Sequence, residues 1–261
     1  WSANFNLTSY KNKVTYIPDA NKTAWLDGVA GYNDGSYFFG EGISMYTLRL
    51  KKYAGVDPET GEALYYKDIY KKDDAGNYVK DANGQPVVES VEKVKNPETA
   101  QYHLCGTTLP DVYGGFGTSF AWKGFDLSFD FMYQIGGQIY DGNYASSMSL
   151  NRGGAMHADL LNAWTPENKN SNIPRIQSQD QYTNSSSDRW LVNASYLSLQ
   201  NINFGYTLPS SWVRKLGLTK VRVYAVGDNL WVWSKRQGLD PRQSISGGQS
   251  NVKYSVVRTI S

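Results

Sequence analysis

The sequence has very little of what most enzymes and metal-binding proteins require. Its 261 residues contain one cysteine, Cys105, and two histidines, His103 and His157. A single cysteine permits no internal disulfide bond, and neither histidine has ligand partners at a metal-binding spacing. A serine-centred elbow, a phosphate-binding loop and a paired-carboxylate motif are also missing. We therefore expect no catalytic residues, no metal ion and no cofactor, with both histidines on polar surface loops.

Three further absences narrow the class of protein. The net charge is +2, with 26 basic and 24 acidic residues, so no broad basic field favours nucleic acid binding. No run approaches the roughly 18 apolar residues of a transmembrane helix. No signal-peptide pattern follows the first residue, Trp1. A transmembrane β-barrel stays open, because each of its strands places only alternate residues in lipid.

Aromatic residues make up 14% of the chain, and in one segment they follow a strict pattern. Residues 114–135 are GGFGTSFAWKGFDLSFDFMYQI, and nine of ten alternate positions are apolar, with Thr118 as the exception. The apolar set is Phe116, Phe120, Trp122, Phe125, Leu127, Phe129, Phe131, Tyr133 and Ile135. The opposite parity carries glycine, serine, Asp126, Asp130 and Gln134. The pattern predicts two antiparallel strands joined by a tight turn at Lys123-Gly124.

Five other segments carry strand signals, which makes about seven strands in all. They cover residues 1–8, 43–53, 194–208, 221–233 and 254–261. Because the alternation already runs at the first residue, we expect the chain to begin within a sheet. In the third of these segments the apolar parity slips between Leu199 and Ile202, which predicts a β-bulge.

Long and short connections alternate between the later strands. Long polar segments lie at residues 53–112, 139–189 and 235–253, whereas the connections at Lys123-Gly124 and residues 209–220 are compact. Compact soluble domains seldom carry several structureless loops of this length. Transmembrane barrels do, with short turns on the periplasmic side and long loops outside the cell.

Some local structure is expected within the long segments. Residues 57–61, DPETG, predict a turn, although their acidic oxygens leave calcium binding as an alternative. Asn83-Gly84 predicts a second hairpin turn. Residues 157–164, HADLLNAW, predict a short helix that Pro166 closes.

Two environments could bury the aromatic face, a second sheet or lipid. Sheets that pack about 10 Å apart must interdigitate, which favours Val, Ile and Leu over many rings. Lipid imposes no such fit, and aromatic rings gather at its interfaces. We therefore predict an all-β, antiparallel transmembrane barrel in which the apolar set faces lipid. Asp126, Asp130 and Gln134 then face a wet lumen, and a role of the two aspartates as general acid and base is the less favoured alternative.

Four stretches carry a resemblance to a known family. They are YAGVDPETGEALYY (53–66), LPDVYGGFGTSFAWKGFDLSFDFMYQIGGQIYD (109–141), SYLSLQNINFGYTLP (195–209), and LGLTKVRVYAVGDNLWVW (216–233) followed by GLDP (238–241). In this order and with these spacings, the chain resembles the C-terminal part of a SusC-like (SusC/RagA-type) TonB-dependent transporter. The resemblance covers most of the chain from about residue 40 onward.

The resemblance implies a large plugged barrel in the outer membrane of a Gram-negative cell. It implies import of oligosaccharides or peptides, driven by TonB, with a SusD-like surface lipoprotein closing over the barrel. Residues 1–261 would then be one part of a single barrel domain, with the plug and the TonB-contacting segment before Trp1. The chain also stops at Arg-Thr-Ile-Ser, before the terminal aromatic strand of the family. We expect a part of a transporter.

Aromatic faces and polar side chains bind sugars and peptides, and the loops offer several. The candidates are Asp188, Arg189, Trp190, Tyr65, Tyr66, Tyr140 and Tyr144. The Asp188–Trp190 cluster is the first candidate because it enters a strand from the longest Asn- and Ser-rich loop, and packing within the loops is the alternative for each residue. Two other functions stay open, a soluble β-sandwich that binds carbohydrate and a barrel that acts as an outer-membrane enzyme, for which no catalytic set is present.

Overall fold

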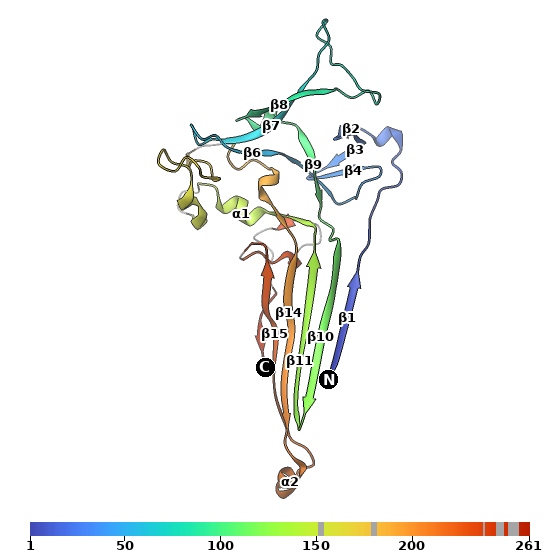
Figure 1. The fold of residues 1–261 in the computed structure, drawn as a ribbon, viewed down its shortest axis with the longest axis vertical. Coiled ribbons are helices and arrows are strands. Elements are labelled where there is room, and N and C mark those ends of the chain that lie inside the picture. The colour runs from blue at the N-terminus through green and yellow to red at the C-terminus, as the bar shows by residue number, and fades with distance from the viewer. Residues whose placement is uncertain (151–153, 179–181, 237, 244–247, 250–255) are drawn as a thin grey trace.

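The protein is described by a computed structural model over residues 1–150, 154–178, 182–236, 238–243, 248–249 and 256–261. Its largest element, here called the long sheet, is an antiparallel sheet of six strands in the order β1-β10-β11-β14-β15-β17 (Figure 1). These strands are β1 (Ser2–Thr8), β10 (Val112–Trp122), β11 (Phe125–Ile135), β14 (Tyr196–Thr207), β15 (Arg222–Ser234) and β17 (Thr259–Ile260). Three smaller sheets lie beyond one end of it.

The two ends of the long sheet differ. At one end, here called the turn end, Lys123-Gly124 joins β10 to β11, and residues 208–221 with α2 (Ser210–Val213) join β14 to β15. Lys123 and Gly124 both have positive φ, 46° and 89°, which is the geometry of a tight hairpin turn and confirms the predicted one. At the other end, here called the loop end, residues 9–111, 136–195 and 235–258 make the long connections.

The strand pairing places the predicted apolar set on one face of the sheet. Phe116 lies opposite Phe131, Phe120 opposite Leu127, and Trp122 opposite Phe125. The same face continues onto β1 through Phe5, which pairs with Phe116, and onto β14 and β15 through rows of apolar partners. Those partners include Leu197, Leu199, Ile202, Phe204, Tyr206, Val223, Trp231 and Trp233.

This apolar face has no second sheet over it in the described part of the chain. None of the nine side chains of the apolar set is buried, and Trp122 keeps 67% of its surface exposed. The rings pack sideways instead, with Phe116 stacked on Phe131 at 4.9 Å between ring centroids. A β-sandwich would bury these rings beneath another layer. The described residues therefore give no support to the sandwich alternative.

The opposite face is polar and cross-linked between strands. Arg222 on β15 donates from Nε and one terminal nitrogen to the Asp126 carboxylate on β11, at 3.1 and 2.5 Å. Asn201 on β14 donates to Asp228 on β15 at 2.8 Å. Asp126 is therefore paired with a cation. Among the described residues, no hydrogen bond links Asp126 to Asp130. The arrangement suits a wet surface better than an acid–base pair.

The predicted bulge is confirmed. The register of β14 against both of its neighbours shifts between Leu199 and Asn201, which leaves Gln200 without a partner residue in either ladder. One extra residue reverses the parity of everything beyond it, so the bulge keeps Leu197 and Leu199 on the apolar face together with Ile202.

The strand predicted at residues 43–53 does not belong to the long sheet, because β1 pairs directly with β10. Its counting among the barrel strands is therefore wrong. The segment is divided between β5 (Thr47–Lys51) and β6 (Tyr53–Val56), which belong to two smaller sheets. The long sheet thus has six described strands instead of about seven. Alternation alone could not distinguish a barrel strand from a strand in a large folded loop, since both have one buried face.

The smaller sheets make up the loop end. One contains β2 (Ala24–Leu26), β3 (Val29–Asp34), β4 (Tyr37–Gly40), β5 and β9 (Tyr102–Thr107). A second contains β6, β7 (Ala63–Tyr70) and β8 (Val88–Val94). The third contains β12 (Gln138–Asp141), β13 (Leu191–Asn193) and β16 (Gly248–Gln249), beside α1 (Gly142–Ser147). Among the described residues, none of the helices is long and apolar enough to cross a membrane.

Two local predictions in these loops have definite outcomes. The predicted helix at residues 157–164 is a 3-10 helix at Ala158–Asn162. His103 was expected on a surface loop, but it is buried on β9, with Nδ1 2.9 Å from Asp27 Oδ1 and Nε2 3.8 Å from Asp68 Oδ2. The polar neighbours in sequence concealed this burial, because the carboxylates that lie beside His103 come from distant segments. The last predicted strand begins at Tyr254, outside the described residues, and its described part is β17.

Candidate functional site

The DPETG segment forms the predicted turn between β6 and β7. The backbone N–H of Asp57 donates to the Glu62 carbonyl at 2.9 Å, and the N–H of Gly61 donates to the Asp57 carbonyl at 2.7 Å. The Asp57 carboxylate accepts from the N–H of Glu59 at 2.9 Å, as in an Asx-turn. The turn prediction is therefore confirmed.

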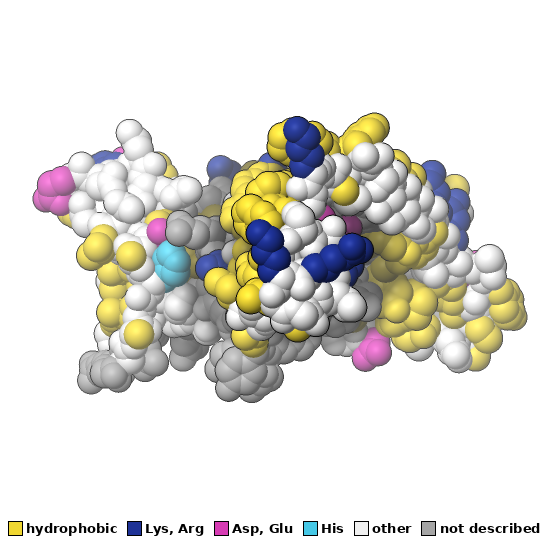
Figure 2. Space-filling view, turned by 90° about the horizontal axis from the view of Figure 1, so that it is seen from below, with side chains coloured by type: hydrophobic (Ala, Val, Ile, Leu, Met, Phe, Trp, Pro, Cys, Tyr) yellow, Lys and Arg dark blue, Asp and Glu magenta, His cyan; other side chains and the backbone are white. Residues whose placement is uncertain are grey.

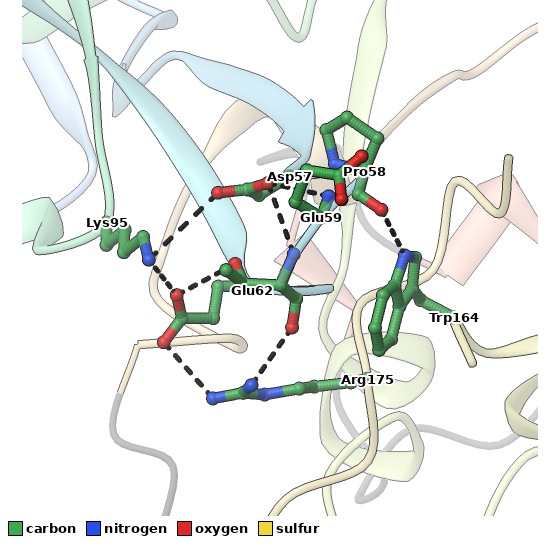
Figure 3. A network of polar contacts seen from close by, with 8 residues as sticks. Asp57, Pro58, Glu59, Glu62, Lys95, Trp164 and Arg175 are labelled. Atoms are coloured by element: carbon green, nitrogen blue, oxygen red, sulfur yellow. Dashed lines mark hydrogen bonds and ion pairs between the residues drawn. The ribbon is translucent and has the colours of Figure 1, made fainter. Parts of the chain in front are cut away.

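The acidic side chains of this turn are held by basic ones (Figure 3). Lys95 contacts the Glu62 carboxylate directly and lies 4.0 Å from Asp57 Oδ2. Arg175 approaches the other oxygen of Glu62 at 3.1 Å. The hydrogen bond from Lys95 lowers the pKa of Glu62 below its ordinary value. These oxygens serve an ion-pair network that belongs to the fold of the loops.

The same turn docks the first long connection onto the second. Trp164 Nε1 donates to the Pro58 carbonyl at 3.0 Å, and Arg175 donates to the Thr60 carbonyl at 2.9 Å (Figure 3). Gly61, with φ of 72°, lies directly against the Trp164 ring, so a Cβ at this position would collide with it. A left-handed backbone and a close ring together require glycine here.

The Asp188–Trp190 cluster makes a second tie between the two connections. Asp188 Oδ1 accepts from the backbone N–H of Tyr53 at 2.8 Å, 135 residues away in sequence. Arg189 lies over the rings of Tyr53 and Trp190 and donates to the Thr183 carbonyl at 3.0 Å. Burial raises the pKa of Asp188 and lowers the pKa of Arg189. Both shifts mark charges drawn into the interior of the loops.

The structure brings most of the predicted substrate residues together at the loop end, but two of them are buried in its hydrophobic core. Trp190 and Tyr65 have no exposed surface, so either ring could meet a substrate only if the loops opened. Trp190 packs on α1 against Ala145 and Met148, with Tyr144 at its edge. Tyr65 meets Tyr53 edge to face in a separate cluster.

The other predicted residues keep partly open surfaces. Tyr66 on β7, Tyr140 on β12 and Tyr144 on α1 are half-buried. Tyr144 donates its hydroxyl to Asp159 at 2.7 Å and lies beneath Arg236, whose guanidinium is 3.6 Å from the ring centroid. Substrate contact by these three tyrosines and by Arg189 stays a prediction.

A hollow that the sequence analysis did not single out lies on the polar face where the long sheet meets the loops. Its volume is about 590 Å³, within the range of small-molecule sites. The principal lining side chains are Tyr10, Tyr113, Met132, Gln134, Tyr196 and Gln200. Strand parity could have found most of them, because Tyr113, Met132 and Tyr196 fall on the same face as the predicted residue Gln134.

One wall of this hollow carries a charge that is already neutralised. Arg242 donates to the Asp240 carboxylate through Nε at 2.8 Å and a terminal nitrogen at 2.7 Å. Asp240 itself is buried. The bidentate pair fixes the guanidinium in place, and the amides and rings around it offer hydrogen bonds and stacking surfaces to an uncharged or polar ligand.

Comparison with known proteins shows which proteins this chain resembles. No protein-family profile matches the chain. It is 31% identical over 249 residues to "TonB-dependent receptor P3" of Formosa agariphila, an alignment that covers 92% of this chain and 23% of that protein. It is 23% identical over 246 residues to "TonB-dependent receptor SusC" of Bacteroides thetaiotaomicron, covering 92% of this chain and 22% of SusC.

The solved structures agree. The RagAB peptide importer in its closed-closed state superposes with a TM-score of 0.69 at 25% identity, over 95% of this chain and 25% of that one. The chain is similar to one part of the SusC-like TonB-dependent receptors. It spans about a quarter of the length of the relatives it matches. The predicted all-β, antiparallel barrel fold is confirmed, and the six-stranded sheet is a portion of the barrel wall.

The one cysteine of these 261 residues, Cys105, lies on β9 in the loop end, where burial raises its pKa to about 11. Because the thiolate is the reactive form, we expect maleimide labelling of Cys105 to be slow at neutral pH and to rise about tenfold per pH unit up to about pH 10. A Cys105→Ser, Ser90→Cys variant places a thiol on the exposed strand β8 as the control. Its rate should level off near the ordinary cysteine pKa of about 8.5. Equal pH profiles for the two thiols, measured by mass spectrometry, would contradict the burial of Cys105.

Proposed function

We propose that the chain forms part of the barrel of an outer-membrane importer that takes up oligosaccharides or peptides. The observation that carries the proposal is the division of the long sheet into two faces. The apolar set, from Phe116 to Ile135, faces lipid, and Asp126, Asp130 and Gln134 line a wet lumen. A charged side chain on the lipid face of a barrel is costly, so the parity leaves only this orientation.

The proposal includes the rest of the transporter. The 261 residues are one part of the barrel domain, and the plug lies elsewhere in the polypeptide. The long connections face outside the cell and the turn end faces the periplasm. A SusD-like lipoprotein covers the loop end, and TonB supplies the force that moves the plug. Support comes from the similarity to SusC and to the RagAB structures, one of which is described as a peptide importer.

Substrate enters at the loop end and passes the loop residues before it reaches the hollow on the polar face. Its tyrosines offer rings for stacking, and Gln134 and Gln200 offer amides for hydrogen bonds. Arg189, Tyr66, Tyr140 and Tyr144 form a more distant part of the same route. Sugar rings and peptides both fit this chemistry, so the residues define a polar, oligomeric substrate without deciding between the two.

Growth of a deletion strain tests the proposal. The full-length gene is deleted and restored, and each strain is grown on a panel of purified glycans and peptides as the limiting nutrient. We expect growth on one nutrient class to be lost and then restored by the gene. Co-purification of the neighbouring SusD-like lipoprotein, where one is encoded, tests the partner. Unchanged growth and uptake across the whole panel, with the receptor shown to be in the outer membrane, would contradict import.

A further inference from the structure

The connection between β14 and β15 has an unusual composition. Residues 208–221 are LPSSWVRKLGLTKV, which include three cations, one tryptophan and no acidic residue. Together with Trp122 and Lys123 of the neighbouring turn, they form what we call the basic knob. Figure 2, which views the molecule from the turn end, shows Lys and Arg side chains gathered there beside hydrophobic ones.

The fold of the connection explains why apolar side chains project from the basic knob. The four residues of α2 are followed by a 3-10 turn at Arg214–Leu216, and Gly217, with φ of 71°, ends it in the left-handed conformation. The N–H of Leu218 then donates back to the Val213 carbonyl at 3.1 Å. Val213 alone is buried by this closure, whereas Trp212, Leu216 and Leu218 keep 60%, 76% and 47% of their surfaces exposed.

The basic knob continues the apolar face of the sheet. The N–H of Leu208 donates to the Val221 carbonyl at 3.0 Å, which extends the β14–β15 ladder beyond the Thr207–Arg222 pair. Alternation places Leu208 and Val221 on the same face as Tyr206 and Val223. In the proposed orientation this is the lipid face, so the knob emerges at the membrane edge.

The cations of the basic knob are not held by carboxylates in the described part of the chain. Within the part of the chain that the structure describes, no ion pair joins Lys123, Arg214, Lys215 or Lys220 to a carboxylate. The carboxylate at this end, Asp126, is already held by Arg222 on the lumen side. Lys123 Nζ lies 4.9 Å from the centroid of the exposed Trp122 ring, an arrangement that holds a cation at the level of an interfacial tryptophan.

Exposed rings, exposed leucines and unpaired cations at the edge of a lipid-facing wall complement one kind of partner. We propose that the basic knob binds the headgroups of anionic phospholipids in the periplasmic leaflet of the outer membrane. The apolar side chains enter the acyl boundary, and Arg214, Lys215 and Lys220 meet the phosphates. The proposal rests on the membrane orientation given under the proposed function, and it is independent of the substrate.

Brominated lipids test the proposal with the full-length receptor in nanodiscs. The emission of Trp212 is obtained as the difference between the wild type and a Trp212→Phe variant. Quenching is compared for nanodiscs that contain the same fraction of brominated phosphatidylglycerol or brominated phosphatidylcholine. We expect the anionic lipid to quench Trp212 more strongly, and the excess to fall as salt is raised.

Charge removal identifies the residues responsible. Each cation that meets the anionic surface contributes roughly fivefold to lipid affinity, so a variant carrying Arg214→Gln, Lys215→Gln and Lys220→Gln should lose the excess quenching. The matched control carries Lys71→Gln, Lys72→Gln and Lys80→Gln at the loop end and should retain it.

Two results would overturn the proposal. Equal quenching by the two lipids would show that the knob has no headgroup preference. No quenching by either lipid would show that Trp212 lies against the plug, another protein or water. A receptor that keeps the lipid preference but imports nothing would contradict the proposed function and leave this inference standing.

Discussion

A lysine in place of Phe129 should weaken the assembly of the full-length receptor in a membrane. Phe129 is near the middle of β11, between Thr118 and Ile202 on the apolar face. A lysine at the membrane midplane on the lipid face of a barrel costs about 2–4 kcal/mol. At about 1.4 kcal/mol for each factor of ten, that cost lowers the equilibrium constant for folding in the membrane by roughly one to three orders of magnitude.

The adjacent residue supplies a matched control. Ser128 lies on the polar face, between Ser119 and Asn203, so a lysine there meets hydroxyl and amide groups and water. We expect Ser128→Lys to assemble like the wild type. Both variants are compared by the heat-modifiable mobility of the full-length receptor in outer-membrane fractions and by urea titration in lipid vesicles. Equal assembly of the two lysine variants would show that the face of Phe129 does not meet lipid.

Removing the Trp190 side chain should loosen the loop end while the barrel still assembles. Trp190 is wholly buried beneath α1, and its Nε1 donates to the Ser185 carbonyl at 3.1 Å. Replacement of a buried tryptophan by alanine costs about 3–5 kcal/mol, through lost burial and the cavity that remains. The loss should be local, because the long sheet makes its own ladders and does not include this cluster.

Leu161→Ala is the control, since Leu161 lies in the same connection and is 89% exposed. Limited proteolysis and amide hydrogen exchange of residues 136–195 provide the measurements. We expect faster cleavage and exchange in Trp190→Ala only, with heat-modifiable mobility unchanged in both variants. Protection equal to that of the wild type would contradict the role of Trp190 as the core of this loop cluster.

Together these two experiments separate two kinds of stability in one chain. The stability of the barrel wall depends on the solvent that each face meets. The stability of the loop end depends on buried side chains and on hydrogen bonds such as the one from the Tyr53 N–H to Asp188. A receptor built in this way can vary its loops without changing the wall that carries them.

The sequence by itself determined the wall. Strict alternation over residues 112–135 fixed which side chains share a face, Lys123-Gly124 fixed the hairpin, and the parity slip after Leu199 located the bulge. These features depend on neighbours in sequence, because a strand has a period of two and a tight turn needs particular backbone angles. The chemical contrast between the two faces was enough to predict a barrel.

Only the tertiary structure decided the roles of the loop residues. A Trp, Arg and Asp in an Asn-rich segment looked like ligand contacts, but Tyr53 from a distant segment contacts Asp188 and Arg189, and α1 packs on Trp190, so these residues are partners within the fold. The same applies to His103, which is buried beside Asp27 and Asp68. It also applies to the predicted strand at residues 43–53, which forms part of the smaller sheets and not of the barrel wall. Long-range contacts leave no periodic trace in sequence, since their energy depends on which segments meet in space and not on residue spacing.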